Sequence, residues 1–262
     1  MNQLEEKMVD ILRDLKENYN AVAVKTEFET EGATKQEALL LKKMAELADL
    51  DFTLKIGGCG ALKDLCEAKE IGVNTIVAPM IESAYAAEKF FKTINVVYSE
   101  AEFDKIKFFI NIETKLGVDN IEEILSSDIS DNITGIVLGR TDLAGSLKMR
   151  KEDVNNRIIF DYAKLVSEKA LKYNKELIVG GGITPSSLSF LVSLPLTSVN
   201  MYETRKIVFD AQKSLGFENS GKGLLKAFEF ELLWLKNKQN ILDEDVKRIA
   251  MLENQLASLM VL

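Results

Sequence analysis

Residues 135–147 read GIVLGRTDLAGSL, a run of small and apolar residues that ends in two charged side chains, Arg140 and Asp142. The first five residues are apolar on both faces, which is typical of a strand covered on both sides. The small residues after Asp142 predict a turn. This stretch therefore predicts a buried strand that delivers charged groups to its carboxyl end.

The same alternation of short apolar runs and longer helical patterns extends through most of the chain. Seven runs read as strands, at 21–25, 52–56, 74–79, 107–113, 135–139, 176–180 and 197–203. Helical patterns follow at 33–49, 60–71, 82–93, 117–126, 154–173 and 184–193, with another from about residue 203. Strands of this kind, separated by helices, predict a parallel sheet that helices cover on both faces.

Two folds satisfy this pattern, an open doubly wound sheet and a closed barrel. The first strand is followed by KTEFE at 25–29, without the glycine-rich turn of dinucleotide-binding sheets. Polar residues follow the carboxyl ends of nearly every strand, where a barrel brings them to one mouth: Lys25, Lys55, Glu82, Glu113, Asp142 and Glu203 with Arg205. We therefore predict an α/β fold, a TIM-type (β/α)8 barrel with an N-terminal helix and a C-terminal helical extension.

The length of 262 residues suits one barrel with short appendages. We expect residues 1–220 to form the barrel with its N-terminal helix, and residues 221–262 to form the helical extension. Apolar residues recur there every seven positions from Leu242. This stripe packs on the barrel or, as we favour, forms a subunit contact with Trp234 as a candidate anchor.

Composition excludes several classes of protein. The 33 basic and 41 acidic residues give a formal charge of −8, without the basic clusters that bind nucleic acid. No apolar run approaches the roughly 20 residues that span a bilayer, and the charged first helix lacks the apolar block of a signal peptide. We expect a cytoplasmic protein with no membrane or nucleic-acid partner.

Histidine is absent and only Cys59 and Cys66 are available as soft ligands. The two thiols are too few for a zinc site and read as free. The lack of histidine removes the commonest general base and the Ser-His-Asp arrangement. Any chemistry must use carboxylates, lysine, arginine, tyrosine, hydroxyls or a metal.

Glu113 and Asp142 end consecutive predicted strands, so a right-handed connection brings both carboxylates to one end of the sheet. Mg²⁺ prefers such oxygen ligands and often uses only one or two protein carboxylates. The alternative is that Glu113 pairs with Lys115 or another base while Asp142 caps the following turn. The spacing alone leaves both interpretations open.

Three further groups could contact a ligand. Lys55 precedes the glycines of KIGGCG at 55–60, where a helix N-terminus offers unpaired N–H groups to a carboxylate or enolate, although a flexible turn explains it equally well. The glycine triplet at 180–182 is explained by a turn into a helix capped by Thr184. Arg205 pairs with Glu203 or binds an anionic substrate.

Three segments in order, TLKIGGCGALKDLCEAKEIGVNTIVAPMIESAYAAEKF, FFINIETKLGVDNIEEIL and GIVLGRTDLAGSL, resemble the HpcH/HpaI aldolase/citrate lyase family of the phosphoenolpyruvate/pyruvate TIM-barrel superfamily. The resemblance covers about residues 52 to 150. It implies that Glu113 and Asp142 are metal ligands for Mg²⁺ or Mn²⁺, and that the ion is chelated by pyruvate or oxaloacetate. It also implies a homo-oligomer, as a dimer, trimer or hexamer.

This chain departs from the family's aldolases at three positions. Lys55 stands where they usually carry an arginine, and Lys25-Thr26-Glu27 stands where they commonly carry a histidine for proton transfer. Arg140 occupies the place of a small residue or proline. The metal-binding part is therefore expected to be retained, and the proton-transfer part to be rebuilt.

We expect a divalent-metal-dependent carbon–carbon lyase, an aldolase that acts on a 2-oxo acid through a pyruvate-type enolate. Lys55, Glu27 and Lys25 are the candidate catalytic residues, of which Lys55 stabilises the enolate and Glu27 or Lys25 handles the proton. The candidate substrate contacts are Lys55, Gly139, Arg140, Thr141 and Arg205. The alternatives are a citrate-lyase-like acyl-CoA lyase, a Schiff-base aldolase built on Lys25 or Lys55, and a metal- and keto-acid-binding barrel without turnover.

Overall fold

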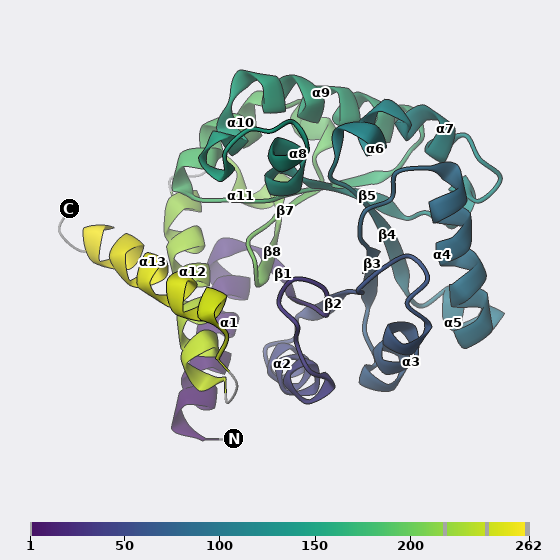
Figure 1. Ribbon diagram of the computed structural model, residues 1–262. Helices are drawn as coiled ribbons and strands as arrows, with labels where there is room; N and C mark the ends of the chain where they lie inside the picture. Colours follow the sequence, from purple (N-terminus) through teal and green to yellow (C-terminus); the bar gives the residue numbers. More distant parts are fainter. Residues whose placement is uncertain (1, 217–218, 239–240, 260–262) are drawn as a thin grey trace.

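The computed structural model describes residues 2–216, 219–238 and 241–259. Within these ranges eight strands form one closed barrel in sequence order, with helices around it (Figure 1). The strands are β1 (Ala21–Glu27), β2 (Asp51–Lys55), β3 (Thr75–Ala78), β4 (Lys107–Ile112), β5 (Gly135–Gly139), β6 (Glu176–Gly180), β7 (Met201–Glu203) and β8 (Ile207–Asp210). The predicted α/β barrel is confirmed.

Helices connect the strands and complete both ends of the chain. They are α1 (Gln3–Tyr19), α2 (Lys35–Leu47), α3 (Leu62–Ile71), α4 (Ala84–Val97), α5 (Glu100–Phe103), α6 (Lys115–Asp119), α7 (Ile121–Leu125), α8 (Arg140–Ser146), α9 (Arg157–Lys172), α10 (Leu188–Ser193), α11 (Ala211–Ser214), α12 (Ser220–Asn237) and α13 (Asp243–Leu259). Short 3₁₀ segments are η1 (Ser130–Asn132), η2 (Lys151–Asn155), η3 (Pro185–Ser187) and η4 (Leu196–Ser198).

The last strand differs from the prediction. We expected a helix from about residue 203, but residues 207–210 form β8, which pairs antiparallel with both β7 and β1. Only three residues separate β7 from β8, and so short a connection can join only antiparallel strands. The main-chain N–H of Thr204 donates to the carbonyl of Ile207 at 2.9 Å and closes this hairpin. The predicted strand 197–203 also begins later, at Met201, because η4 precedes it.

The barrel has a small apolar interior and a large apolar exterior. Inside, the cluster consists of Val77, Phe109, Val137 and Ile178, with Met201 packed against them. A far larger cluster lies between the strands and the surrounding helices. Apolar side chains therefore fill only part of the interior, and charged side chains occupy its carboxyl end.

The C-terminal helices pack on the chain's own N-terminal helix. Figure 1 shows α12 beside α1, with α13 lying across α12. Leu252 of the predicted apolar stripe is buried with Phe228 and Leu235 between α12 and α13, while the first residue of the stripe, Leu242, is exposed. Trp234 is buried in the main core, which makes it unsuitable as an exposed anchor.

The tail's last residues, 260–262, and residue 1 lie outside the described part of the chain. Among the helices of the described ranges, none combines the length and the apolar character needed to cross a membrane.

Candidate functional site

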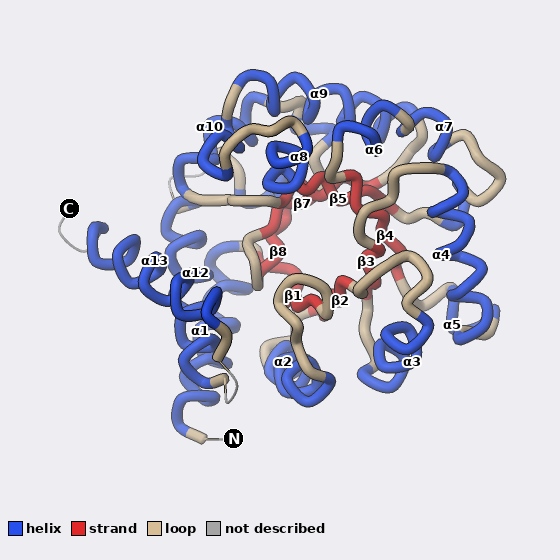
Figure 2. The backbone as a smooth tube through the Cα atoms, viewed as in Figure 1, coloured by secondary structure: helices blue, strands red, loops and turns tan. Residues whose placement is uncertain are grey.

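Loops surround the ring of strands at the mouth of the barrel (Figure 2). Lys55 ends β2 and is only 6 % exposed, while Glu113 follows β4 and is 2 % exposed. Asp142 lies in the first turn of α8, directly after β5. The strand ends therefore bring these three predicted site residues to one mouth.

Lys55 forms ion pairs with two carboxylates. Its Nζ lies 2.6 Å from Oε2 of Glu29, in the loop after β1, and 3.4 Å from Oε2 of Glu113. Burial opposes the charged form of Lys55, but Glu113, Glu27 and Glu29 raise its pKa above the ordinary value. Lys55 is therefore a fixed ammonium group.

Glu113 is held by donors on both oxygens. Oε1 accepts from the main-chain N–H of Met80 at 3.0 Å, and Oε2 accepts from the Asn111 side-chain amide at 2.6 Å. Burial raises the pKa of Glu113, and the charges of Asp142 and Glu29 raise it further against the opposing effect of Lys55. At Glu113 the effects of burial and of neighbouring negative charge therefore outweigh the positive charge of Lys55, and we call this carboxylate under-compensated.

Asp142 is exposed, and none of the residues in the described ranges forms a hydrogen bond or ion pair with its carboxylate. Its negative charge is one of the causes that raise the pKa of Glu113, so the two carboxylates interact electrostatically. We name Lys55, Glu29, Glu113 and Asp142 the β2–β5 cluster. When all four are ionised, one ammonium against three carboxylates leaves two negative charges.

This donor set fits a divalent cation in type. Mg²⁺ and Mn²⁺ bind carboxylate oxygens and keep open positions for water or substrate. The raised pKa of Glu113 indicates a site where added positive charge is favourable. The described residues contain no group of three or more acidic or soft side chains arranged around one point, so Glu113 and Asp142 would have to act as a pair.

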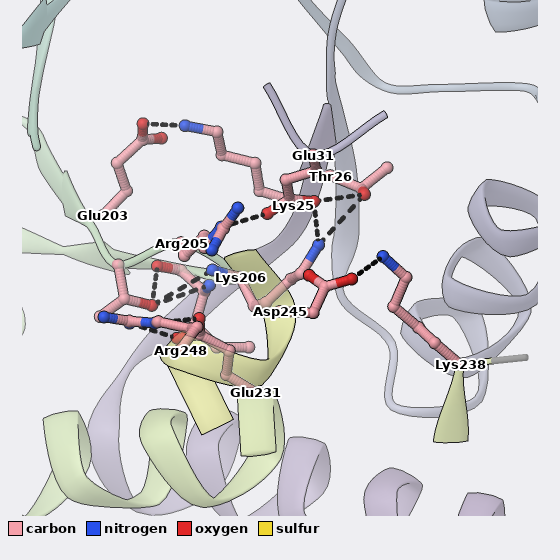
Figure 3. A network of polar contacts seen from close by, with 12 residues as sticks. Lys25, Thr26, Glu31, Glu203, Arg205, Lys206, Glu231, Lys238, Asp245 and Arg248 are labelled. Carbon is pink, nitrogen blue, oxygen red and sulfur yellow. Dashed lines mark hydrogen bonds and ion pairs between the residues drawn. The ribbon is translucent and has the colours of Figure 1, made fainter. Parts of the chain in front are cut away.

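A second set of ion pairs lies at the β7–β8 hairpin (Figure 3). Lys206, 2 % exposed, pairs with Glu31 and donates to the hydroxyl of Thr26 at 3.2 Å, while Nε of Arg205 donates to Glu31 at 2.9 Å. Burial alone would raise the pKa of Glu31, but Lys206 and Arg205 lower it below the ordinary value. We name these four residues the hairpin cluster.

Arg205 is therefore engaged by Glu31 rather than by Glu203, the partner considered from the sequence. Glu203 instead pairs with Lys25 across the barrel interior (Figure 3). Burial opposes the charged form of Lys25, but Glu203 and Glu27 raise its pKa. The bond to Glu31 uses only Nε of Arg205, whose side chain is partly exposed, and the contact of Arg205 with substrate stays a prediction.

Glu27 lies between the two clusters. Its Cα is paired with that of Lys55 across β1 and β2, and its side chain is half-buried. Burial and the charge of Glu31 raise the pKa of Glu27, while the neighbouring lysines oppose this effect. A carboxyl group with a raised pKa can exchange a proton near neutral pH more readily than an ordinary glutamate.

The candidate substrate contacts around β5 are arranged differently from the expectation. Arg140 is fully buried, and its donors are bound to protein acceptors. With no carboxylate beside it, burial lowers its pKa to about 9. A Cβ built on Gly181 would lie 2.5 Å from the main-chain nitrogens of Arg140 and Thr141, so a side chain at position 181 would collide with the start of α8.

A side chain at position 139 would collide with Glu113, which explains the glycine there. A Cβ at this position would stand 2.7 Å from both Cβ and Oε2 of Glu113. The absence of a side chain at this position therefore leaves room for the Glu113 carboxylate, and the contact of Gly139 with substrate stays a prediction.

The sequence did not predict four residues that belong to these two networks of polar contacts. Glu29, Glu31 and Asn111 belong to the networks above, and Lys206 is the buried base of the hairpin cluster. Glu27, Glu29 and Glu31 recur at every second position from the end of β1, a signal that could have placed Glu29 and Glu31 at the mouth. The pairing of Glu31 with Lys206, 175 positions apart, has no local signal.

Comparisons with known proteins relate part of the sequence to one family. Residues 58–173 match the family model described as HpcH/HpaI aldolase/citrate lyase. No match was found among the curated proteins.

Solved structures share the fold at low sequence identity. An HpcH/HpaI aldolase from Desulfitobacterium hafniense DCB-2 has a TM-score of 0.60 at 14 % identity, covering 75 % of this chain and 81 % of its own. A family protein from Burkholderia cenocepacia J2315 has a TM-score of 0.57 at 13 % identity, with coverages of 74 % and 90 %. The citrate synthase SbnG has a TM-score of 0.56 at 16 % identity, with coverages of 71 % and 78 %.

The matched segment contains Glu113 and Asp142 and the strands that present them. The resemblance predicted from the sequence is therefore confirmed: the central part of this chain carries the pattern of the HpcH/HpaI aldolase/citrate lyase family.

Proposed function

We propose that this protein is a carbon–carbon lyase of the aldolase type, which acts on a 2-oxo acid through a pyruvate-type enolate and uses Mg²⁺ or Mn²⁺ held by Glu113 and Asp142. The family match supports lyase chemistry. The observation that carries the proposal is the pairing of a buried, under-compensated Glu113 with an exposed Asp142 at the barrel mouth. Such a pair leaves open positions for the keto acid.

When bound, the cation would supply Lewis-acid stabilisation of the negative charge that develops on the keto oxygen. Lys55 adds a second positive group beside Glu113, and its raised pKa keeps it charged. A lysine offers a point charge where the family's aldolases usually carry the fork of an arginine, so it can stabilise the enolate oxygen but cannot bind a carboxylate in a bidentate manner.

Proton transfer at the enolate carbon falls to Glu27. Its raised pKa and its place opposite Lys55 suit a group that takes and returns a proton at C3 of pyruvate. Lys25 is the weaker candidate, because Glu203 holds it as an ammonium. Lys25 instead orients Glu203 and adds positive charge to the interior.

The Schiff-base alternative has less support. An amine that attacks a carbonyl must be deprotonated, which needs a lowered pKa. The pKa values of Lys25 and Lys55 are both raised, since each amine has carboxylate partners. Borohydride trapping with pyruvate tests the point, and this proposal expects no covalent adduct.

The proposal is tested by exchange of the pyruvate methyl protons in heavy water, followed by NMR with added Mg²⁺ or Mn²⁺. The expected result is cation-dependent exchange that EDTA abolishes and that Asp142→Asn lowers by about 10²-fold or more. Asp128→Asn, an exposed acidic position elsewhere, serves as the matched control and should exchange at the wild-type rate. Binding of oxalate without exchange would favour a barrel that has lost turnover and would contradict the lyase.

A further inference from the structure

Arg140 has an unusual environment for a charged group. Its Nε donates to the carbonyl of Gly180 at 3.0 Å and its Nη2 to that of Gly181 at 2.9 Å. Its Nη1 donates to the carbonyl of Val154 at 3.2 Å and to Oδ1 of Asn155 at 2.8 Å. No carboxylate of the described ranges pairs with it, so its donors serve to hold main-chain segments in place.

These acceptors lie on the two segments that border α8. Gly180 and Gly181 end β6 and begin the following loop, while Asn155 ends η2. The Phe190 ring of α10 lies 4.6 Å from the guanidinium carbon and covers one face of the group. One side chain thus joins the start of α8 to three neighbouring elements.

The loop after β6 also approaches the start of α8 through its main chain. Gly181 has a φ of +75°, which favours glycine, and a Cβ there would lie only 2.5 Å from the nitrogens of Arg140 and Thr141. Asp142 is the next residue of this short helical turn. The turn that carries the Asp142 carboxylate is therefore held by the Arg140 side chain and by the glycine loop together.

We propose that Arg140 is a positioning residue that fixes Asp142 relative to Glu113 for cation binding. This inference rests on the proposed function. Because Asp142 itself has no hydrogen-bond or ion-pair partner in the described part of the chain, its placement depends on the backbone of its turn. Arginine is required, since a lysine ammonium cannot reach acceptors distributed around a planar fork.

A double-mutant cycle on the metal-binding equilibrium tests this role. The dissociation constant for Mn²⁺ alone is measured by electron paramagnetic resonance for wild type, Arg140→Lys, Asp142→Asn and the double variant. Loss of groups that orient metal ligands typically weakens metal binding 10- to 100-fold, so Arg140→Lys is expected to weaken Mn²⁺ by about tenfold or more. With Asp142→Asn already present, the same change is expected to alter the constant less than about threefold.

Equal weakening in both backgrounds would overturn the inference, because a general loss of folding does not depend on Asp142. Unchanged Mn²⁺ binding by Arg140→Lys would also overturn it while leaving the proposed function intact. A wild-type protein that fails to bind Mn²⁺ would contradict the proposed function itself, and this role with it. Arg157→Lys, an exposed arginine on α9, is the matched control and should bind as wild type does.

A milder variant covers the case in which Arg140→Lys does not fold. Asn155 is exposed and supplies only one acceptor to the guanidinium, so Asn155→Ala should fold. The expected result is about threefold weaker Mn²⁺ binding that disappears in the Asp142→Asn background. Wild-type affinity in Asn155→Ala would then count against Arg140 as a positioning residue.

Discussion

The β2–β5 cluster and the hairpin cluster lie at the same barrel mouth and each contains a buried lysine paired with glutamate, but their charges are balanced differently. In the hairpin cluster one buried carboxylate, Glu31, has two basic partners, and its pKa is lowered. In the β2–β5 cluster one ammonium, Lys55, faces several carboxylates, and the pKa of Glu113 is raised.

The difference separates a structural network from a candidate binding site. Satisfied ion pairs at the hairpin join β1 to the antiparallel β8 and help close the barrel. In the β2–β5 cluster the carboxylates outnumber the one ammonium group, and a cation can neutralise the remaining negative charge. Charge balance therefore distinguishes the two clusters.

The largest expected effect is on stability, at the hairpin cluster. Glu31→Gln leaves Lys206 buried without its anionic partner, and breaking a buried pair typically costs about 3–5 kcal/mol. Urea denaturation should show this loss, while Mn²⁺ affinity stays near the wild-type value. Glu70→Gln, which breaks an exposed pair with Lys35, should cost less than about 1 kcal/mol. A large loss of Mn²⁺ affinity in Glu31→Gln would mean that the two clusters are not separate.

The substitution Lys55→Met tests the role of the one ammonium group in the β2–β5 cluster. Removal of one positive group that faces a developing negative charge typically lowers kcat by about 10²- to 10³-fold. We expect a loss of that size in pyruvate proton exchange, measured at saturating Mn²⁺. A variant that keeps its rate would show that Lys55 serves only to balance Glu29 and Glu113.

Gly139→Ala tests the room left for Glu113. The added Cβ would meet the Glu113 side chain at 2.7 Å, and overpacking of this kind costs about 1–3 kcal/mol. We expect Mn²⁺ affinity to fall by about tenfold as the carboxylate is displaced. Gly145→Ala, in the α8 helix that follows β5, meets nothing within 4 Å and should leave the affinity unchanged.

The pH dependence of cation binding gives the smallest expected effect. Only ionised Glu113 binds a cation, so affinity is lost as the pH falls through its pKa. Because that pKa is raised, the loss should begin above the ordinary glutamate value of about 4.3, and then approach tenfold per pH unit. Isothermal titration calorimetry with Mn²⁺ across this range checks it. A loss that starts only below the ordinary value would contradict the under-compensated Glu113.

The pKa of Glu31 is shifted in the opposite direction from that of Glu113, and its pH dependence should appear in the stability of the protein. A lowered pKa contributes stability that is fully present above the unfolded value of about 4.3 and is lost as the pH falls through the lower folded value. The stability difference between wild type and Glu31→Gln should therefore shrink in acid. If the difference were constant across this range, the hairpin pairs would not be responsible for it.

Much of the fold and part of the site follow from local sequence patterns. Lys55, Glu113 and Asp142 were found because each follows an apolar run, and parallel strands bring such positions to one end of a barrel. β8 was not predicted because each earlier strand is followed by a helix, and the same was expected after β7. Instead, a three-residue turn leads directly into the four residues of β8.

Arg140 shows what local patterns do not contain. Three of its four acceptors are main-chain carbonyls, which any residue can supply, and they belong to segments 14 to 41 positions away. Its burial depends on the packing of α8, η2 and the loop after β6, which local sequence patterns do not show. The sequence therefore predicted a substrate contact at the mouth, whereas the side chain is fully buried in the structure.

The most direct test of the account is the Mn²⁺ dissociation constant of the wild-type protein compared with Glu113→Gln and Asp142→Asn, with Asp128→Asn as control. We predict measurable binding by wild type and the control, and a loss of about tenfold or more in each of the two carboxylate variants. Equal affinity in all four proteins would contradict the claim that Glu113 and Asp142 form the cation site.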